Sequence, residues 1–189
     1  MQNAIILHGK ANQTKYYDPA FDSPSNASWL PWLQKQLLMR DILAQTPEMP
    51  LPWKPEYSAW SKELGRFNIT PETILVGHSC GAGFLLRYLS EHSDVYVGKV
   101  VLVAPWIDPD RSGGTGEFFD FTFDSRLPDR TIQTTIFVSK DDFDGVHIST
   151  KIIREAIPSI GHREFTKHGH FLQITEFPEL RDELLTAAR

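Results

Sequence analysis

The segment Thr73-Ile74-Leu75-Val76-Gly77-His78-Ser79-Cys80-Gly81 decides the fold. Its first four residues form a short run of β-branched and apolar side chains, which predicts a buried strand. Beyond Gly81, apolar residues recur at helical spacing and predict a helix, at Phe84, Leu85, Tyr88 and Leu89. A serine bracketed by glycines between a strand and a helix is typical of a nucleophile elbow, the tight turn that presents a serine hydroxyl above a sheet.

Other segments of the chain extend this strand and helix pattern in both directions. Apolar or β-branched runs predict further strands at 4–7, 41–45, 100–103, 135–138 and 164–166. Apolar periodicity predicts helices at 29–37, 57–64, 148–157 and 176–188. Ser28 is the expected N-cap of the first of these helices, and Gly65 the expected end of the second. The alternation predicts an α/β fold with a mostly parallel central sheet and helices on both faces.

Two long connections interrupt this alternation. A polar, turn-rich loop is expected from Lys10 to Asn26. The stretch 106–128 is irregular and contains four phenylalanines, at 118, 119, 121 and 123. We expect one domain over residues 1–189, with 106–128 as a lid over an acyl pocket or as part of the core.

The overall composition is that of an ordinary globular chain. Its 189 residues include 19 Lys and Arg against 24 Asp and Glu, a formal net charge of −5, with neither sign gathered into a block. Neither a nucleic-acid nor a membrane partner is expected, and no apolar run has the length of a membrane span. Because Cys80 is the single cysteine and the N-terminus lacks a signal-peptide pattern, a cytoplasmic protein is expected.

A serine hydroxyl becomes a useful nucleophile only when a base takes its proton and an acid orients that base. In chains with this elbow the order is serine, acid, histidine. Asp142, after the strand at 135–138, and His170, between the last strand and the last helix, satisfy that order. The alternatives are Asp141 or Asp144 for the acid and His168 for the base.

The developing negative charge on the substrate oxygen needs two hydrogen-bond donors. The backbone N–H of Cys80 is the first candidate, because it follows the nucleophile at the start of a helix. The N–H of Lys10 is the second, because Gly9-Lys10 follows the first strand. The Cys80 thiol is expected to point away from the site, and His78 to pack within the elbow.

Two further motifs carry weaker signals. The histidines of His168-Gly169-His170 lack an acidic or sulfur ligand at a known metal-binding spacing, so neither a metal nor a cofactor is expected. Asn68-Ile69-Thr70 matches a glycosylation acceptor, but a turn before a strand is the simpler interpretation.

Five motifs together resemble the small serine hydrolases typified by the YdeN protein and the retinoblastoma-binding protein 9. They are His8-Gly9, Trp29-Leu30-Pro31-Trp32-Leu33, Gly77-His78-Ser79-Cys80-Gly81-Ala82, Ser139-Lys140-Asp141-Asp142 and His168-Gly169-His170-Phe171. The resemblance spans nearly the whole chain. It implies a compact α/β-hydrolase fold, a triad of Ser79, Asp142 and His170, and hydrolysis of small esters.

Two segments depart from the family pattern. The stretch between His8-Gly9 and Trp29 is longer than usual in the family. This difference affects the expected shape of the pocket rim and the choice of the Lys10 N–H as the second oxyanion donor. In this fold Val-Pro often follows the acidic residue of the triad. In this chain the residues after Asp142 are instead Phe143-Asp144-Gly145-Val146-His147, and this difference affects the choice of Asp142 as the acid.

The function expected from the sequence is hydrolysis of a small-molecule acyl substrate through a covalent acyl-enzyme on Ser79. An amidase or peptidase with the same triad is an alternative, since the attack chemistry is shared. A second alternative is a non-catalytic interaction module that binds a protein through the aromatic stretch at 106–123. The sequence leaves the oligomeric state open.

Overall fold

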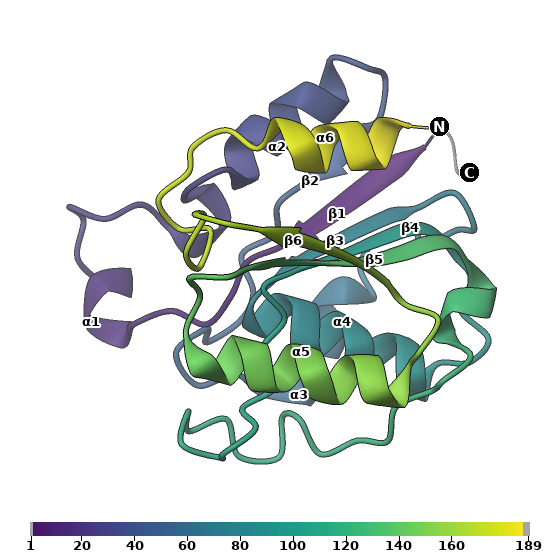
Figure 1. The fold of residues 1–189 in the computed structure, drawn as a ribbon. Coiled ribbons are helices and arrows are strands. Elements are labelled where there is room, and N and C mark those ends of the chain that lie inside the picture. Colours follow the sequence, from purple (N-terminus) through teal and green to yellow (C-terminus); the bar gives the residue numbers. More distant parts are fainter. Residues whose placement is uncertain (1, 187–189) are drawn as a thin grey trace.

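A six-stranded parallel sheet forms the centre of this computed structural model, which describes residues 2–186 (Figure 1). The strands lie in the order β2-β1-β3-β4-β5-β6, and all five neighbouring pairs run parallel. Their bounds are β1 Asn3–Leu7, β2 Leu43–Gln45, β3 Ile74–His78, β4 Val97–Val103, β5 Thr131–Ser139 and β6 Gly161–Phe165. The predicted parallel central sheet of an α/β fold is confirmed.

Helices cover both faces of the sheet. The principal helices are α2 Leu30–Leu38, α3 Tyr57–Leu64, α4 Cys80–Glu91, α5 Asp144–Ala156 and α6 Pro178–Leu185. Figure 1 shows α2 and α6 on one face and α3, α4 and α5 on the other. This double cover explains the unbroken apolar runs, because a strand buried on both faces has no polar side to present to water. Ile5, Leu75 and Val101 of the central strands are at most 1% exposed.

The sheet order determines where a ligand site can form. The chain passes from β1 to β2 on one side of β1 and returns with β3 on the other side. In open parallel sheets, the crevice outside the carboxyl ends of the strands at such a reversal is the usual ligand site. Here that crevice lies between the loops that follow Leu7 of β1 and His78 of β3.

The connection from Lys10 to Asn26 is more structured than predicted. It contains a four-residue helix, α1 (Gln13–Tyr16), and a single 3₁₀ turn at Pro24–Asn26. Helix α1 projects beyond the edge of the sheet where the strands end (Figure 1). Its N-cap is Asn12, whose side-chain oxygen accepts a hydrogen bond from the Lys15 N–H at 3.1 Å.

The prediction that Ser28 is the N-cap of the first long helix is wrong. Helix α2 begins one residue later than predicted, with Trp29 in the cap position, and Ser28 has a left-handed φ of 55°. Its hydroxyl instead donates a hydrogen bond to the carbonyl oxygen of Leu172 at 2.9 Å. Ser28 therefore joins the start of α2 to the loop after His170 rather than closing the helix.

Other boundaries shift by a few residues. Strand β2 begins at Leu43 rather than at Asp41, because Asp41 has a left-handed φ of 59°. Strand β5 begins earlier than predicted, at Thr131, and α5 begins earlier, at Asp144. The predicted closing helix corresponds to α6 (Pro178–Leu185), and its last predicted residues, 187 and 188, lie outside the described residues.

The stretch predicted to be irregular, 106–128, is so up to a 3₁₀ helix at Leu127–Arg130, but two of its phenylalanines belong to the core. Phe118 and Phe119 are 2% and 8% exposed. The Phe118 ring lies 5.1 Å from that of Trp60 and 6.0 Å from that of Phe84, which come from α3 and α4. The structure therefore favours the core interpretation for these two side chains.

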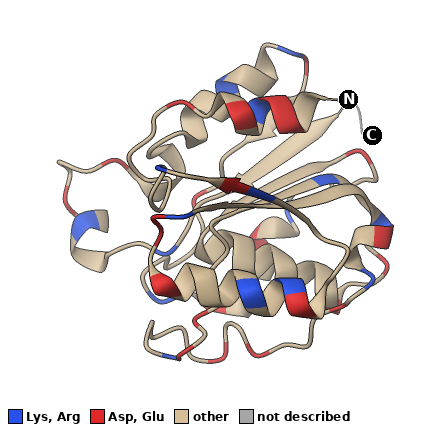
Figure 2. Cartoon of the chain, viewed as in Figure 1, with Lys and Arg blue, Asp and Glu red and all other residues tan. Residues whose placement is uncertain are grey.

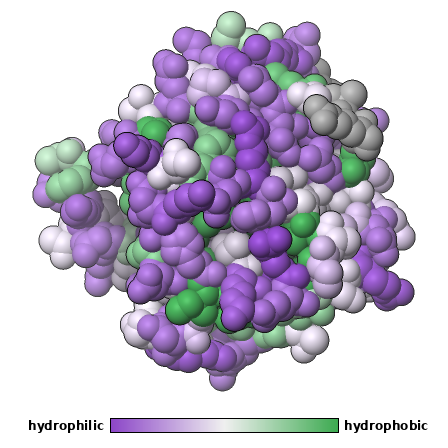
Figure 3. All heavy atoms as spheres, viewed as in Figure 1, coloured by the Kyte–Doolittle hydropathy of each residue, from purple (hydrophilic) through white to green (hydrophobic). Residues whose placement is uncertain are grey.

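The surface mixes charges of both signs. In Figure 2, Lys and Arg alternate with Asp and Glu over the helices and loops. The face in Figure 3 is mainly hydrophilic, with scattered hydrophobic atoms. Within residues 2–186, no helix combines the length and apolar character that crossing a bilayer requires.

Candidate active site

The turn from β3 into α4 places Ser79 in a strained conformation. Ser79 has φ 54° and ψ −119°, which non-glycine residues rarely adopt. Its N–H donates to the carbonyl oxygen of Val103 at 2.8 Å, so the turn is held against the neighbouring strand β4. A Cβ on Gly77 would lie 2.6 Å from the Cα of Ala82, so only glycine fits there. Such strain is characteristic of functional turns.

The loop after β1 lies directly against this turn. A Cβ on Gly9 would lie 2.9 Å from the Cβ of Ser79, and a Cβ on Gly81 would overlap the carbonyl oxygen of His8. The two glycines therefore allow the backbone after β1 to approach Ser79 within van der Waals distance.

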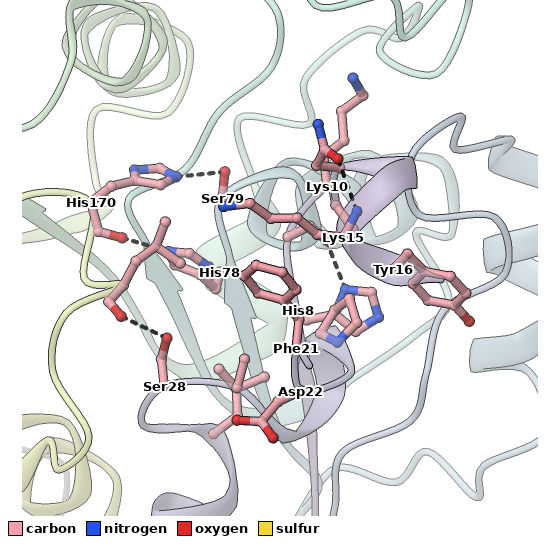
Figure 4. A pocket seen from close by; sticks show the side chains of 17 residues that line it. His8, Lys10, Lys15, Tyr16, Phe21, Asp22, Ser28, His78, Ser79 and His170 are labelled. Carbon is pink, nitrogen blue, oxygen red and sulfur yellow. Dashed lines mark hydrogen bonds between the residues drawn. The ribbon is translucent and has the colours of Figure 1, made fainter. Parts of the chain in front are cut away.

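Ser79, His170 and Asp142 form a continuous hydrogen-bonded chain. The His170 Nε2 lies 2.9 Å from the Ser79 Oγ (Figure 4), and the His170 Nδ1 lies 2.9 Å from the Asp142 Oδ1. With Asp142 ionised, its oxygens only accept, so Nδ1 carries the proton and Nε2 is free to accept from the serine hydroxyl. The structure thus brings together the three residues expected from the sequence.

Burial makes Asp142 a suitable partner for this histidine. Its side chain is fully buried, whereas that of His170 is 19% exposed. The Asp142 Oδ1 also accepts a hydrogen bond from the Phe143 N–H at 2.8 Å. A carboxylate held in this way orients the adjacent imidazole through its Nδ1.

The neighbouring Asp141 has a different position. Its Oδ1 accepts from the Ser139 hydroxyl at 2.5 Å and from the Gly169 N–H at 2.9 Å. These hydrogen bonds, the one from Ser139 foremost, lower the pKa of the Asp141 carboxyl. Asp141 therefore ties the loop after β5 to the histidine loop. The third candidate, Asp144, is the first residue of α5.

His168, the alternative base, turns into an aromatic cluster. Its ring lies 4.8 Å from that of Phe165, 5.5 Å from that of Phe171 and 5.9 Å from that of Phe177. The His168 N–H donates to the Ser139 hydroxyl at 2.9 Å, which fixes the loop. His168 therefore packs within the fold while His170 faces Ser79.

His78 contacts the main chain of His170, which the sequence did not predict. Its Nε2 lies 2.9 Å from the carbonyl oxygen of His170 (Figure 4), and since a carbonyl only accepts, this nitrogen carries a proton. Burial, reinforced by repulsion from His170, lowers the pKa of His78 to about 3. His78 is therefore neutral at physiological pH.

A second buried histidine, His8, fixes the start of the loop after β1. Its Nδ1 donates to the Gly9 carbonyl oxygen at 2.7 Å, and its Nε2 accepts from the Met49 N–H at 2.9 Å. Burial lowers the pKa of His8, so this neutral tautomer persists. The His8-Gly9 motif was recognisable in the sequence, but the hydrogen bond to Met49 crosses 41 residues and left no local signal.

The Cys80 thiol is unsuited to act as a nucleophile. Its side chain is fully buried, and burial raises the pKa of the thiol well above its ordinary value. Within the described chain, the backbone N–H groups of Cys80 and Lys10 donate to no other protein group. Both amides are therefore available to a ligand.

Comparison with known proteins identifies the family. The family model described as serine hydrolase matches residues 18–171 of this chain. The chain belongs to the serine hydrolase family. Its matched region contains the serine, the aspartate and the histidine described above.

Individual relatives of this serine hydrolase agree with that assignment. The chain is 29% identical to the YdeN protein of Bacillus subtilis (strain 168) over 188 residues, which cover 95% of this chain and 90% of YdeN. The crystal structure of the B. subtilis ydeN gene product superposes with a TM-score of 0.76 at 26% identity, covering 97% and 96% of the two chains. Est1E from Butyrivibrio proteoclasticus shares the fold alone, with a TM-score of 0.58 at 10% identity over 97% and 85% of the chains.

A cavity of about 390 Å³ opens beside Ser79 in this hydrolase (Figure 4). Ser79, His78 and His170 form one wall, and the segment from His8 to Leu30 supplies most of the others. Leu172 closes the cavity next to His170. None of the phenylalanines at 118–123 is among its described lining residues, so the segment that shapes this pocket is 10–28 rather than 106–128.

Ser79 also lines a second hollow, of about 330 Å³. Trp106 and Phe143 line it together with residues 10–12. The Trp106 N–H donates to the Ser79 carbonyl oxygen at 3.2 Å, and the Phe143 ring lies 4.8 Å from that of His170. Ser79 therefore lines both hollows.

The donor set gives no indication of a metal centre. Among residues 2–186, no three His, Cys, Asp or Glu side chains are grouped so that they could hold an ion.

Proposed function

We propose that the chain hydrolyses carboxylic esters through a covalent acyl-enzyme on Ser79. The observation that carries the proposal is the chain of hydrogen bonds in which one imidazole, that of His170, bridges the Ser79 Oγ and the Asp142 carboxylate. This arrangement supplies a nucleophile, a base and an orienting acid in the required geometry.

In the first half-reaction the Ser79 Oγ attacks the ester carbonyl carbon, and its proton moves to the His170 Nε2. The negative charge of Asp142 stabilises the resulting imidazolium. The bond between the carbonyl carbon and the alcohol oxygen then breaks. His170 returns the proton to that oxygen, so a neutral alcohol leaves and the acyl group stays on Ser79.

In the second half-reaction a water molecule replaces the alcohol. His170 takes one proton of the water as its oxygen attacks the acyl carbon. When the bond to the Ser79 Oγ breaks, His170 gives the proton back to that oxygen. The products are a carboxylic acid and the original hydroxyl, so atoms and protons balance over the cycle.

The N–H groups of Cys80 and Lys10 are our candidates for stabilising the oxyanion in both steps. Cys80 is the first residue of α4, where the helix N-terminus favours negative charge. The Lys10 amide follows Gly9, which lies against Ser79. Donors already in place cost no reorganisation when the charge develops, which makes such sites effective.

The sequence left two alternatives, an amidase or peptidase and a non-catalytic protein-binding module. Matched substrates test the first, and the burial of the aromatic residues bears on the second. Amide hydrolysis uses the same attack, so paired p-nitrophenyl esters and p-nitroanilides of one acyl group distinguish the two activities. A protein-binding role for residues 106–123 has less support, because Phe118 and Phe119 are buried and unavailable to a partner.

The experiment is a rate measurement with p-nitrophenyl acetate and butyrate. The wild-type protein is expected to hydrolyse both, with faster turnover of the ester than of the matched anilide. Replacing Ser79→Ala is expected to reduce the rate to near background while the far-UV circular dichroism spectrum stays unchanged. Equal rates for the wild type and the variant would overturn the proposal.

A further inference from the structure

The cavity beside Ser79 contains an uneven set of charges. Two of its lining residues are cations, Lys10 and Lys15, and one is an anion, Asp22. Its histidines His8 and His78 are kept neutral by burial, which lowers the pKa of each. The charged side chains that line the cavity are therefore two cations and one anion, and the Glu48 carboxylate lies behind its wall, 3.6 Å from the His8 Nε2.

These charges are separated within the cavity. Figure 4 shows Lys15 between Ser79 and Tyr16, whereas Asp22 lies at the end remote from Ser79. The Lys15 Nζ lies 5.1 Å from the centroid of the Phe21 ring, another lining residue, so its ammonium group sits over a cavity wall. In this view Lys15 thus lies toward Ser79 and Asp22 lies away from it.

Neither lysine is neutralised by the protein. Within residues 2–186, neither Lys10 nor Lys15 forms an ion pair with a carboxylate, although other lysines such as Lys140 and Lys151 do. An anion entering the cavity would therefore meet unpaired ammonium groups and would displace no internal partner.

The helix that carries Lys15 is anchored. The Tyr16 ring lies 4.8 Å from that of Trp53, and the Tyr17 ring lies 5.1 Å from it. The Asn12 side chain caps the helix through the Lys15 N–H. These contacts hold α1 at the cavity rim, so the Lys15 ammonium is presented from a fixed backbone rather than from a free loop.

We propose that this hydrolase prefers esters that carry a carboxylate in the part of the substrate bound by the cavity of about 390 Å³ beside Ser79, with Lys15 as its principal partner and Lys10 as a second. This inference rests on the proposed ester hydrolysis. The carboxylate belongs either to the acyl or to the alcohol part, because Ser79 and His170 both line this cavity.

Two matched substrate pairs distinguish these sources. For the acyl part, the p-nitrophenyl esters of glutarate and of monomethyl glutarate are compared, and for the alcohol part, the acetate esters of 4-hydroxybenzoate and of its methyl ester. Each pair gives a ratio of kcat/KM for the anionic over the neutral substrate. Dividing the ratio of a variant by that of the wild type cancels the intrinsic reactivity of the esters.

Lys15→Gln is expected to lower this ratio about two- to fivefold for one pair, the range of a solvent-exposed ion pair. Lys15→Glu is expected to lower it further, and Lys15→Arg to keep it. The wild-type ratio is expected to fall toward that of Lys15→Gln at about 1 M salt, where charges are screened beyond roughly 3 Å. The matched control is Lys62→Gln, an exposed lysine in the last turn of α3, which is expected to leave both ratios unchanged.

The outcomes separate this inference from the proposed function. If the wild type hydrolyses the neutral esters but Lys15→Gln and Lys15→Glu leave both ratios unchanged, the carboxylate preference is overturned and ester hydrolysis stands. If no ester is hydrolysed and Ser79 does not react with an acylating probe, the proposed ester hydrolysis is overturned, and the carboxylate preference that rests on it falls with it. A loss of ratio in one pair supports the inference and identifies the part of the substrate that carries the charge.

Discussion

The imidazole of His78 donates a 2.9 Å hydrogen bond to the main-chain carbonyl oxygen of His170. The residue before the proposed nucleophile thus holds the residue proposed as its base, across 92 positions of sequence. The rings of the two histidines lie 4.9 Å apart. The elbow therefore positions both Ser79 and the backbone that carries its partner.

Removing this donor is expected to reduce turnover. In His78→Leu the His170 carbonyl oxygen loses its partner, and an unsatisfied acceptor costs about 1–3 kcal/mol, which the loop can relieve by moving. We expect kcat to fall at least about tenfold with a smaller change in KM, because small misplacements of a catalytic group are costly. His78→Gln, whose amide can donate from a similar position, is expected to recover most of the loss. Equal kcat values for the two variants would show that the hydrogen bond has no positioning role.

The buried histidines also predict a pH-dependent stability. Because the pKa of His78 falls from 6.5 to about 3 on folding, the unfolded chain binds more protons than the folded chain below pH 6.5. The free energy of unfolding is therefore expected to decrease as the pH falls from 6.5 toward 4, by up to about 1.4 kcal/mol per pH unit for this histidine. His8, whose pKa is also lowered, contributes in the same direction.

Urea unfolding of the wild type and of His78→Gln at pH 7, 6 and 5 measures this effect. The variant is expected to show the shallower dependence, since it lacks one titrating group. Parallel pH profiles for the two proteins would contradict the assignment of His78 as a neutral buried group.

The two adjacent aspartates are expected to respond differently to the same change. Asp142→Asn replaces the partner of the His170 Nδ1 with an amide that can stabilise the wrong tautomer, and such a change costs about 10⁴ in kcat in serine hydrolases with this triad. Asp141→Asn weakens the hydrogen bonds that the carboxylate accepts from the Ser139 hydroxyl and the Gly169 N–H, neither of which involves His170, so we expect a loss of at most about tenfold. Steady-state kinetics on a p-nitrophenyl ester decides, and a larger loss for Asp141→Asn would exchange the two roles.

The close approach of Gly9 to Ser79 gives a steric prediction. In Gly9→Ala the new Cβ would lie 2.9 Å from the Cβ of Ser79, so the loop that carries the Lys10 amide must move. We expect kcat to fall at least about tenfold, with a lower melting temperature. The control is Gly65→Ala, at a helix end with an ordinary φ of −66°, which is expected to retain activity. Full activity in Gly9→Ala would argue against the Lys10 amide as an oxyanion donor.

Cys80 is expected to be unreactive in the folded protein. Its side chain is fully buried and its thiol pKa is raised by burial, so little thiolate forms and reagents cannot reach it. Iodoacetamide at pH 8 is expected to leave activity intact and to modify Cys80 only after denaturation. Rapid inactivation of the native protein, accompanied by modification of Cys80, would contradict this prediction and favour Cys80 as the nucleophile.

Local patterns predicted the fold and the elbow because the information they need is local. Gly77 and Gly81 around Ser79 mark a turn whose geometry depends on a few neighbouring residues, and the apolar runs mark strands covered on both faces. Ser79, Asp142 and His170 could be predicted because each follows a predicted strand, in the chain order that accompanies this elbow. The structure then shows these three side chains in contact.

The remaining details depend on contacts that a pattern does not carry. Adjacent aspartates point in different directions, and only the register of the loop after β5 determines that Asp142 meets His170. Helix α1 has four residues and no apolar face, so periodicity could not find it. The role of Phe118 was undecided because its partners, Trp60 and Phe84, come from distant helices.

The most direct test of the central claim is labelling with a fluorophosphonate probe followed by peptide mass spectrometry. A serine activated by an adjacent base reacts with such a probe, whereas an ordinary surface serine does not. We predict one adduct per wild-type chain, located on Ser79, strongly reduced labelling in His170→Ala, and none in Ser79→Ala. An unlabelled wild type, or an adduct that persists in Ser79→Ala, would contradict the assignment of Ser79 as the nucleophile.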